Sequence, residues 1–338
     1  MHSIFYIVTF LIVDSISALS TDFFRHWNCI GIKQNIDFTV PYKANIGELP
    51  LVIWKSRKTN KLLSRINICP HMGSKLDNGI ITESGCLKCQ YHGLELSEPD
   101  TFGEIKEHEG KLFWSHRPYK PIPESIPFYN NVIFEKSFLQ IDMESSLTDS
   151  AYNTMDLRHP EYVHNTIVGF GSDVPPENIK YFKYRTDENR IGMSFDYSSN
   201  SMMRVINKNV KKTNNFHMFV YPTFSWSRVS FAGNDLVIGV NLLPIGENKT
   251  RWFITICHNY YTTEFGKNFV QLMANTILSQ DYVQMKNQYP NNKLKREMIF
   301  THIFKNEEPI LEIKRMFEEY KYPNIDDCVE LYKSDIKK

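Results

Sequence analysis

The sequence contains two short stretches, Ile68-Cys69-Pro70-His71-Met72-Gly73 and Cys86-Leu87-Lys88-Cys89-Gln90-Tyr91-His92-Gly93, that decide its fold. The first offers Cys69 and His71 in a C-x-H pattern. The second offers Cys89 and His92 in a C-x-x-H pattern. Thiolates select iron–sulfur clusters or zinc, and imidazole suits iron and zinc alike, so the spacing must decide between these metals.

The spacing favours an iron–sulfur cluster over zinc. A common zinc finger pairs Cys with Cys on one turn and His with His on a helix, whereas this chain pairs Cys with His twice. Rieske [2Fe-2S] centres place two thiolates on one iron and two imidazoles on the other, so two such loops can ligate one cluster. About 17 residues between His71 and Cys89 leave room for a hairpin that brings the loops together. The predicted cluster ligands are Cys69, His71, Cys89 and His92.

The stretch from near Trp27 to Pro118 resembles the Rieske family and covers a little over a quarter of the chain. Respiratory members of that family carry an extra cysteine in each loop, and the two form a disulfide. This sequence has Gly73 and Ser74 after its first loop, so Cys86 has no partner there. The resemblance is therefore to the oxygenase branch, and we expect Cys86 to be an ordinary buried thiol.

A second group of candidate ligands lies in the run Asn153-Thr154-Met155-Asp156-Leu157-Arg158-His159-Pro160-Glu161-Tyr162-Val163-His164. Asp156 and His159 are three residues apart, which predicts that they share one helix face. Pro160 marks a local break that lets His159 and His164 converge. A lone Asp or His is more often a cap or a hydrogen-bonded core group. Two histidines and one carboxylate, however, form the facial triad of non-haem Fe(II) oxygenases, and a Rieske motif precedes them.

The third ligand must come from a later segment. Residues 194–261 alternate in short apolar segments, which predicts an antiparallel sheet with a hairpin turn at residues 246–249. A long helix is predicted over residues 264–288. This ending resembles that of Rieske oxygenases, in which such a helix returns an Asp to the iron, and Asp281 is the acidic residue in its body. Glu264, at the helix start, and Asp235, in a turn, are weaker alternatives.

The pattern N-x-x-D-x-x-H-x-x-x-x-H resembles the iron motif of ring-hydroxylating Rieske oxygenases. The resemblance implies that Asp156 is a bridge rather than a ligand. Its carboxylate would orient His159 and would contact the residue matching His92 in a neighbouring subunit. This implies a cyclic homotrimer, in which electrons pass from the cluster through His92 and Asp156 to the iron.

These assignments predict an α+β chain. Residues 21–118 are expected to form a small antiparallel β Rieske domain, and residues 119–338 a helix-grip (START-like) catalytic domain with an antiparallel sheet and a long helix. Residues 307–320 read as one more amphipathic helix. We expect the basic end that follows to be solvated.

The predicted function is that of an O₂-dependent oxidoreductase, with monooxygenation favoured over dioxygenation. It would hydroxylate or demethylate an apolar aromatic, sterol or pigment-like substrate. Electrons would come from a ferredoxin or separate reductase, because the chain has no recognisable flavin or nicotinamide motif. The candidates for pocket aromatics, although such residues are more often core, are Phe182, Phe195, Phe219 and Trp226. Two other classes stay open: a Rieske electron carrier without mononuclear iron, and an apolar-ligand binder that consumes no O₂.

The composition of the chain limits the classes of function and the compartments that are open to it. The 338 residues carry a formal net charge of +1, so no basic field argues for nucleic acid. The scattered cysteines do not read as a disulfide framework, which favours a reducing, intracellular compartment. Residues 4–13 form an apolar run that is too short to span a membrane. Residues 1–20 could be a cleaved leader, a membrane-surface anchor or a packed element, and a plastid is the most coherent destination for a leader.

Overall fold

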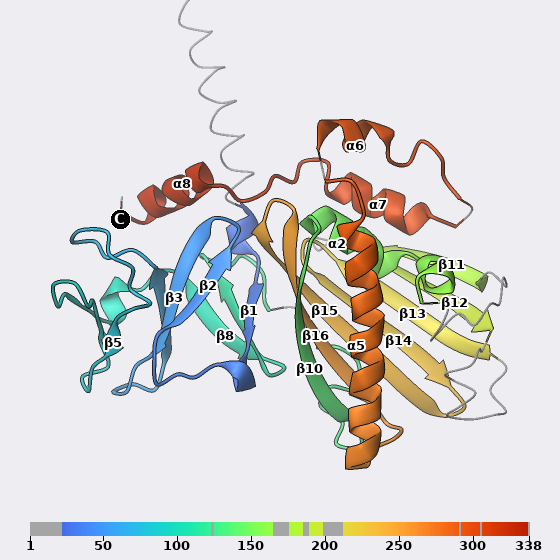
Figure 1. Cartoon of the computed structure of the whole chain (residues 1–338), viewed down its shortest axis with the longest axis horizontal. Helices are drawn as coiled ribbons and strands as arrows, with labels where there is room; N and C mark the ends of the chain where they lie inside the picture. The colour runs from blue at the N-terminus through green and yellow to red at the C-terminus, as the bar shows by residue number, and fades with distance from the viewer. Residues whose placement is uncertain are drawn as a thin grey trace, which may run out of the picture. The chain divides into compact units, whose positions relative to one another are not determined.

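The computed structural model describes residues 22–122, 125–164, 176–184, 189–198, 212–290, 292–304 and 306–336. Residues 1–20, for which the sequence leaves a leader or an anchor open, lie outside these ranges. The chain divides into two compact units: unit 1 comprises residues 1–123 and 319–338, and unit 2 comprises residues 124–318. The predicted α+β class is confirmed, with small antiparallel sheets in unit 1 and a large antiparallel sheet with helices in unit 2 (Figure 1).

Unit 1 is built from three three-stranded antiparallel sheets, in the orders β1-β9-β8, β2-β3-β4 and β5-β6-β7. The strands are β1 (Asn28–Ile32), β2 (Tyr42–Ile46), β3 (Leu49–Lys55), β4 (Leu62–Ile66), β5 (Ile80–Ile81), β6 (Leu87–Lys88), β7 (Glu95–Leu96), β8 (Glu104–His108) and β9 (Lys111–Ser115). The centre of β3 is the apolar run Leu-Val-Ile-Trp. Because apolar side chains point to both sides of the strand there, it is buried on both faces.

One hydrophobic cluster joins the second and third of these sheets. It includes Val52 and Trp54 from β3 and Leu87 from β6, and the two candidate cluster cysteines, Cys69 and Cys89, belong to it. The indole N–H of Trp54 also donates to the carbonyl of Gly85 at 3.2 Å. The cysteines are therefore held by the same apolar packing that holds the sheets together.

The C-terminal end differs from the expected solvated tail. Residues Ile325–Ile336 form helix α8, which belongs to unit 1, so by contact it groups with residues 22–122 rather than with the predicted domain 119–338. Its Cys328 and Leu331 side chains are buried. They are three residues apart and so share one helix face. The charged residues around them hide this apolar pattern in the sequence. Just before the helix, the carbonyl of Pro323 accepts a 2.9 Å hydrogen bond from the N–H of Glu48.

Unit 2 is organised by a seven-stranded antiparallel sheet in the order β10-β16-β15-β14-β13-β12-β11. The strands are β10 (Glu135–Met143), β11 (Glu177–Tyr184), β12 (Arg190–Ser198), β13 (Lys212–Val220), β14 (Phe224–Phe231), β15 (Asn234–Gly246) and β16 (Lys249–His258). The predicted hairpin turn is confirmed, since Gly246 pairs with Lys249 where β15 meets β16.

The helices of unit 2 are α2 (Leu147–Met155), α3 (His159–Tyr162), α5 (Glu264–Lys286), α6 (Lys293–Met298) and α7 (Glu308–Met316). The long helix α5 lies across one face of the sheet (Figure 1) and agrees with the predicted helix over residues 264–288. It begins at Glu264 because the side chain of Thr263 caps it, accepting a hydrogen bond from the N–H of Gly266 at 3.2 Å. Helix α7 lies within the range predicted for the tail helix.

The central strands of this sheet are buried on both faces. Side chains of β15 alternate, so that Ile238 faces a cavity under α5 while Val237 packs in a hydrophobic cluster with Ile126 and Cys257. This two-sided burial explains the long apolar runs of β15 and β16. In the described part of the chain, no helix has both the length and the hydrophobicity that spanning a membrane requires.

Replacing Leu331 with alanine tests the docking of α8. Leu331 is 3% exposed, whereas its neighbour Tyr332 is 38% exposed on the same helix. We expect Leu331→Ala to lower the free energy of unfolding by about 2–4 kcal/mol, because it leaves a cavity. The control Tyr332→Ala should change it by less than about 0.5 kcal/mol. Chemical denaturation followed by circular dichroism measures both, and equal effects would contradict a docked helix.

Candidate metal centres

The two predicted cluster loops have the same backbone geometry. In the first loop the N–H of Cys69 donates to the carbonyl of Ser74 at 2.8 Å, and the N–H of Gly73 donates to the carbonyl of Cys69 at 2.8 Å. The second loop repeats both bonds, from Cys89 to Leu94 at 2.8 Å and from Gly93 to Cys89 at 3.0 Å. Gly73 and Gly93 both have a φ of 75°, a conformation that glycine adopts without strain.

The four predicted ligands divide into an inner and an outer pair. The thiols of Cys69 and Cys89 are buried, whereas His71 and His92 are exposed, with ring centroids 4.8 Å apart. Two thiols facing one another and two imidazoles facing solvent are the donor arrangement that a Rieske cluster needs. Cys86 is a free, half-buried thiol rather than the fully buried one that we expected.

The environment of Cys89 favours its thiolate form. Burial raises the pKa of this thiol, but the N–H groups of Tyr91 and His92 and the nearby Cys69 thiol more than offset that effect, so the pKa is lowered overall. The thiolate is the metal-binding form of cysteine. The residues present therefore fit a [2Fe-2S] cluster.

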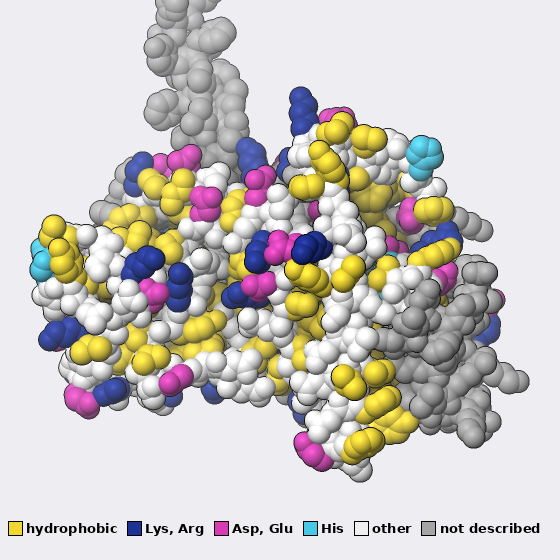
Figure 2. Space-filling view, viewed as in Figure 1, with side chains coloured by type: hydrophobic (Ala, Val, Ile, Leu, Met, Phe, Trp, Pro, Cys, Tyr) yellow, Lys and Arg dark blue, Asp and Glu magenta, His cyan; other side chains and the backbone are white. Residues whose placement is uncertain are grey.

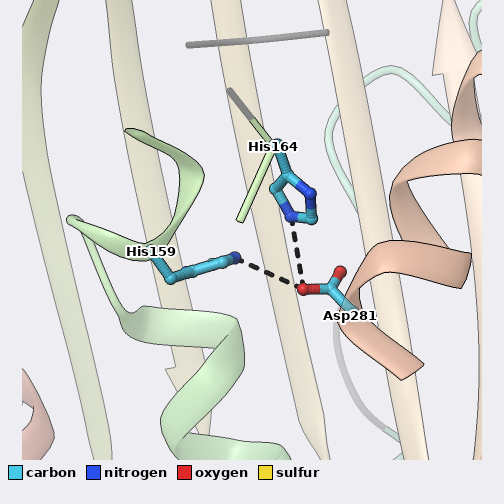
Figure 3. A group of neighbouring side chains, drawn as sticks. All are labelled: His159, His164 and Asp281. Carbon is cyan, nitrogen blue, oxygen red and sulfur yellow. Dashed lines mark ion pairs between the residues drawn. The ribbon is translucent and has the colours of Figure 1, made fainter. Parts of the chain in front are cut away.

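In unit 2 the structure brings His159, His164 and Asp281 together (Figure 3). The Nε2 atom of His164 lies 3.2 Å from Oδ1 of Asp281, and Nε2 of His159 lies 3.7 Å from the same oxygen. One ligand atom from each residue lies within 4.8 Å of the other two. Two imidazoles and a carboxylate on one point form the donor set of a facial triad for iron.

Hydrogen bonds to the other ring nitrogens orient both histidines. Nδ1–H of His159 donates to the backbone carbonyl of Asp156 at 3.0 Å. Nδ1–H of His164 donates to Oε1 of Gln280 at 2.9 Å. Because each Nδ1 is committed to a protein acceptor, Nε2 of each ring is the nitrogen that is left to bind a metal.

The local backbone differs from the predicted continuous helix. Helix α2 ends at Met155, so Asp156 and His159 do not share its face, and Pro160 lies near the start of α3, where its missing N–H costs nothing. The Asp156 carboxylate accepts the backbone N–H groups of Arg158 at 2.8 Å and His159 at 3.3 Å. It thus fixes the turn, and the group that orients His159 is the carbonyl of Asp156 rather than its carboxylate.

Burial and the shared carboxylate act differently on the two histidines. Burial, partly offset by the carboxylates of Asp156 and Asp281, lowers the pKa of His159. Burial also disfavours the charged form of His164, but its hydrogen bond to Asp281 outweighs burial and raises the pKa. The neutral form is therefore favoured for His159, and the protonated form is favoured for His164.

The two weaker candidates for a third ligand lie elsewhere. Glu264 is exposed in the first turn of α5. The carboxylate of Asp235 is bound to Arg228, with Oδ1 2.8 Å from the guanidinium Nε. Of the three acidic residues considered, Asp281 is the one that meets the histidines.

The structure also reveals two contacts that the sequence argument missed or left without a role. Gln280, which accepts the hydrogen bond from His164, is a lone amide beside Asp281, and no spacing pattern marks it. Asn153 is the first residue of the N-x-x-D-x-x-H-x-x-x-x-H motif, and its amide nitrogen lies 3.4 Å from Oδ1 of Asp281. Such partners come from segments far apart in the chain, so only the fold identifies them.

A cavity of about 300 Å³ opens at the triad, between α5 and the sheet. Of the four aromatic residues proposed for the pocket, Phe195 lines it. Trp226 and Phe182 instead pack against Phe216, and Phe219 packs against Phe317. The apolar lining of the cavity comprises Leu157, Pro160, Phe195, Val229, Leu236, Ile238, Val240, Trp252, Ile254, Ile256, Phe269, Val270, Met273, Ala274, Ile277 and Leu278.

A second, larger hollow of about 950 Å³ lies on the outer side of the metal site, and Asp156 and His159 are among its lining residues. Several of the side chains around it are exposed and hydrophobic: Tyr162, Tyr289, Leu294, Met298 and Phe304. Figure 2 shows hydrophobic side chains gathered over α6, which contributes to this hollow.

A family model described as the Rieske [2Fe-2S] domain matches residues 26–111. Pheophorbide a oxygenase, chloroplastic, from Oryza sativa subsp. japonica is 37% identical over 68 residues, which are 20% of this chain and 13% of that protein. Flavonoid 8-hydroxylase 2, chloroplastic, from Ocimum basilicum is 22% identical over 268 residues, which are 70% of this chain and 50% of that protein. The chain thus matches half or less of the length of these curated relatives.

Solved structures share the fold over most of the chain. Dicamba monooxygenase bound to dicamba has a TM-score of 0.72 and 14% identity, covering 93% of this chain and 99% of its own. Pseudomonas putida CBB5 NdmA with caffeine has a TM-score of 0.70 and 13% identity, covering 88% and 91%. The resemblance to the Rieske [2Fe-2S] domain is confirmed over residues 26–111, and the group of His159, His164 and Asp281 could hold a metal ion. The ligand assignment residue by residue stays a prediction.

The contact between His164 and Gln280 generates a prediction about metal affinity. Gln280→Leu removes the acceptor that orients His164, so we expect Fe(II) to bind about 10–100-fold more weakly while the cluster spectrum persists. The matched control is Gln271→Leu, the same substitution on the same helix away from the triad. Fe(II) titration against a competing chelator measures both variants. Unchanged affinity in Gln280→Leu would show that this bond does not orient the ligand.

Proposed function

Because this chain carries a Rieske [2Fe-2S] domain within the fold of Rieske oxygenases, we propose that it is an O₂-dependent oxygenase, with monooxygenation favoured. The observation that supports this most directly is the convergence of His159, His164 and Asp281 at one end of an apolar cavity. An electron carrier has no need for a three-ligand site that opens into a substrate-sized cavity.

In this proposal each group of residues has one task. Cys69, His71, Cys89 and His92 hold the cluster, and the triad residues hold the mononuclear iron. When bound, the cluster supplies single electrons and the mononuclear iron activates O₂. The hydrogen bonds to Nδ1 of each histidine keep the triad oriented, and the apolar cavity excludes water and positions the substrate.

The reaction needs an external electron donor. Hydroxylation consumes the substrate, O₂, two electrons and two protons, and yields a hydroxylated product and water. The sequence offers no flavin or nicotinamide motif that could supply these electrons. We therefore assign the donor role to a ferredoxin or a separate reductase.

The size of the cavity narrows the substrate class. A cavity of roughly 150 Å³ holds benzene, so the 300 Å³ found here suits an aromatic molecule of about two rings. This favours a small aromatic substrate over the larger sterol and pigment-like alternatives. The relatives are named for a flavonoid and for pheophorbide a, which are both larger than two rings, so the estimate of substrate size rests on the cavity alone.

The names of the curated relatives also support a location. Pheophorbide a oxygenase and flavonoid 8-hydroxylase 2 are both described as chloroplastic. A plastid interior is reducing enough for the free thiols of this chain, all six of which are unpaired. We infer a plastid location on this basis.

Metal stoichiometry tests the proposed oxygenase against a carrier or binder with a cluster alone. Anaerobically purified protein should hold about three irons and two sulfides per chain, two irons in the cluster and one at the triad. His159→Ala and Asp281→Ala should each lose one iron and keep the cluster spectrum, whereas the control Glu264→Ala should keep all three. Two irons in the reconstituted wild type would exclude the oxygenase, and full retention by Asp281→Ala would exclude that ligand.

A homotrimer is the assembly that this proposal favours. The exposed end of unit 1 carries the imidazoles of His71 and His92 with the exposed hydrophobic side chains of Met72 and Tyr91, and Figure 2 shows histidine and hydrophobic side chains together at that end. The 950 Å³ hollow beside Asp156 is likewise rimmed by hydrophobic side chains. A cluster end of one subunit seated in the hollow of the next would give a cyclic, head-to-tail assembly.

Met298→Asp tests this assembly, because Met298 is 63% exposed on the rim of the hollow. A buried charge there should cost about 2 kcal/mol, which raises the subunit dissociation constant about 30-fold. The control is Val132→Asp, an exposed hydrophobic position outside the hollow, which should leave assembly unchanged. Light scattering over a concentration series measures both. A monomeric wild type, or equal effects of the two variants, would contradict the proposed interface.

A further inference from the structure

The inward face of the sheet carries a polar pair in a largely apolar wall. His217 on β13 lies directly opposite Ser227 on β14 in the antiparallel register, and both residues line the cavity. Their row continues with Ile238 on β15 and Ile256 on β16, which are apolar. Directly opposite residues have Cβ atoms about 5 Å apart on the same face, so one ligand atom can contact both side chains.

Two of the other polar residues in the wall are already occupied within the protein. The amide N–H groups of Asn215 donate to the carbonyl and hydroxyl of Thr213 at 3.2 and 3.0 Å. The hydroxyl of Ser225 donates to the carbonyl of Met218 at 3.1 Å. These bonds leave those donors committed, whereas the hydroxyl of Tyr197, which also lines the cavity, makes no hydrogen bond among the described residues.

His217 and Ser227 have no such partners among the described residues. The buried Nδ1 atom of His217 makes no hydrogen bond there. Neither does the hydroxyl of Ser227, which faces the cavity. The His217 ring is held in place by edge contact with Phe195, at a centroid distance of 5.0 Å. A polar ring without a protein partner is costly to bury, and a ligand can contact His217 through the part of the ring that lines the cavity.

The charge of the cavity defines what that ligand can be. Among the described residues that line it there is no lysine or arginine, while Asp156 and Asp281 contribute carboxylates. Burial, together with the nearby His159 imidazole, lowers the pKa of His217 to about 4, so its imidazole is neutral. An anionic substrate would therefore meet no lysine or arginine, and a divalent cation at the triad would already be balanced by these two carboxylates. A neutral oxygen, in contrast, meets a donor and an acceptor.

We propose that His217 and Ser227 form the specificity site of this cavity, and that they bind a neutral hydroxyl or carbonyl oxygen on an apolar, roughly two-ring aromatic substrate. The claim that the ligand is a substrate rests on the proposed function, whereas the claim that the pair binds a ligand rests on the geometry alone. By holding one polar end of the ligand at the β13–β14 row, the pair determines which part of the ring system faces the triad.

Binding of three matched probes to the full-length, metal-loaded protein tests the proposal. The probes are naphthalene, 2-naphthol and 2-naphthoate, and equilibrium dialysis under anaerobic conditions measures binding without turnover. We expect 2-naphthol to bind about tenfold more tightly than naphthalene, because it gains a hydrogen bond to a buried partner. The carboxylate should bind most weakly.

The variants separate the pair from the rest of the wall. His217→Leu should bring 2-naphthol to within about twofold of naphthalene and leave naphthalene unchanged, and Ser227→Ala should remove part of the preference. The control Ser225→Ala, whose hydroxyl is already committed to Met218, should keep the preference. Thermal unfolding confirms that each variant is folded.

Three outcomes would overturn the proposal: a preference that survives His217→Leu, a carboxylate that binds most tightly, or no binding of any probe. Failure of the oxygenase assignment would be seen separately, as a missing third iron. A protein with two irons that still prefers 2-naphthol through His217 would refute the oxygenase and support the binding site.

Discussion

The constraint on which the catalytic unit depends is a carboxylate buried in an apolar cavity. Asp281 is 5% exposed, and its Oδ1 faces two imidazole nitrogens. A buried charge is tolerated only where an opposite charge or several hydrogen bonds compensate it. Asn153 contributes one weak bond at 3.4 Å, and burial lowers the pKa of His159, so that this imidazole offers no charge. A divalent cation at the point where the three ligand atoms meet supplies what the protein does not, so the donor set itself argues for a metal.

The rest of unit 2 can be understood as the frame that makes this convergence possible. Helix α2 starts where the Ser146 side chain accepts the N–H of Asp149 at 3.1 Å, and its end at Met155 releases the chain into the turn that carries the histidines. Helix α5 runs from its Thr263 cap across the sheet and delivers Asp281 from the opposite side. The Asp156 carboxylate fixes this turn through the N–H groups of Arg158 and His159, and the turn sets the position of His159.

The sequence predicted which residues would meet at the candidate site better than it predicted the helices and turns that carry them. The prediction of the cluster loops and of Asp281 depended on residue type and spacing, both of which metal chemistry restricts, and the structure brings Asp281 to the two histidines. Asp156 was placed on the wrong element, since a step of three fits a helix as well as it fits a turn followed by a new helix. Gln280 and α8 were missed for a different reason. Their roles depend on contacts with distant segments, and a single sequence shows no pattern for such contacts.

The division of labour within unit 2 explains how metal binding and substrate choice can be set independently. The three predicted ligand residues come from α3, the turn after it and α5, whereas the polar pair proposed to bind the substrate lies on strands β13 and β14 of the sheet. A substitution at His217 or Ser227 changes the polarity of the cavity wall and touches none of the hydrogen bonds that orient His159 and His164. The antiparallel register pairs each inward residue of β13 with an inward residue of β14, so both strands present their side chains to the same face of the sheet. The chemistry at the iron and the identity of the substrate are thus encoded by different elements of one fold.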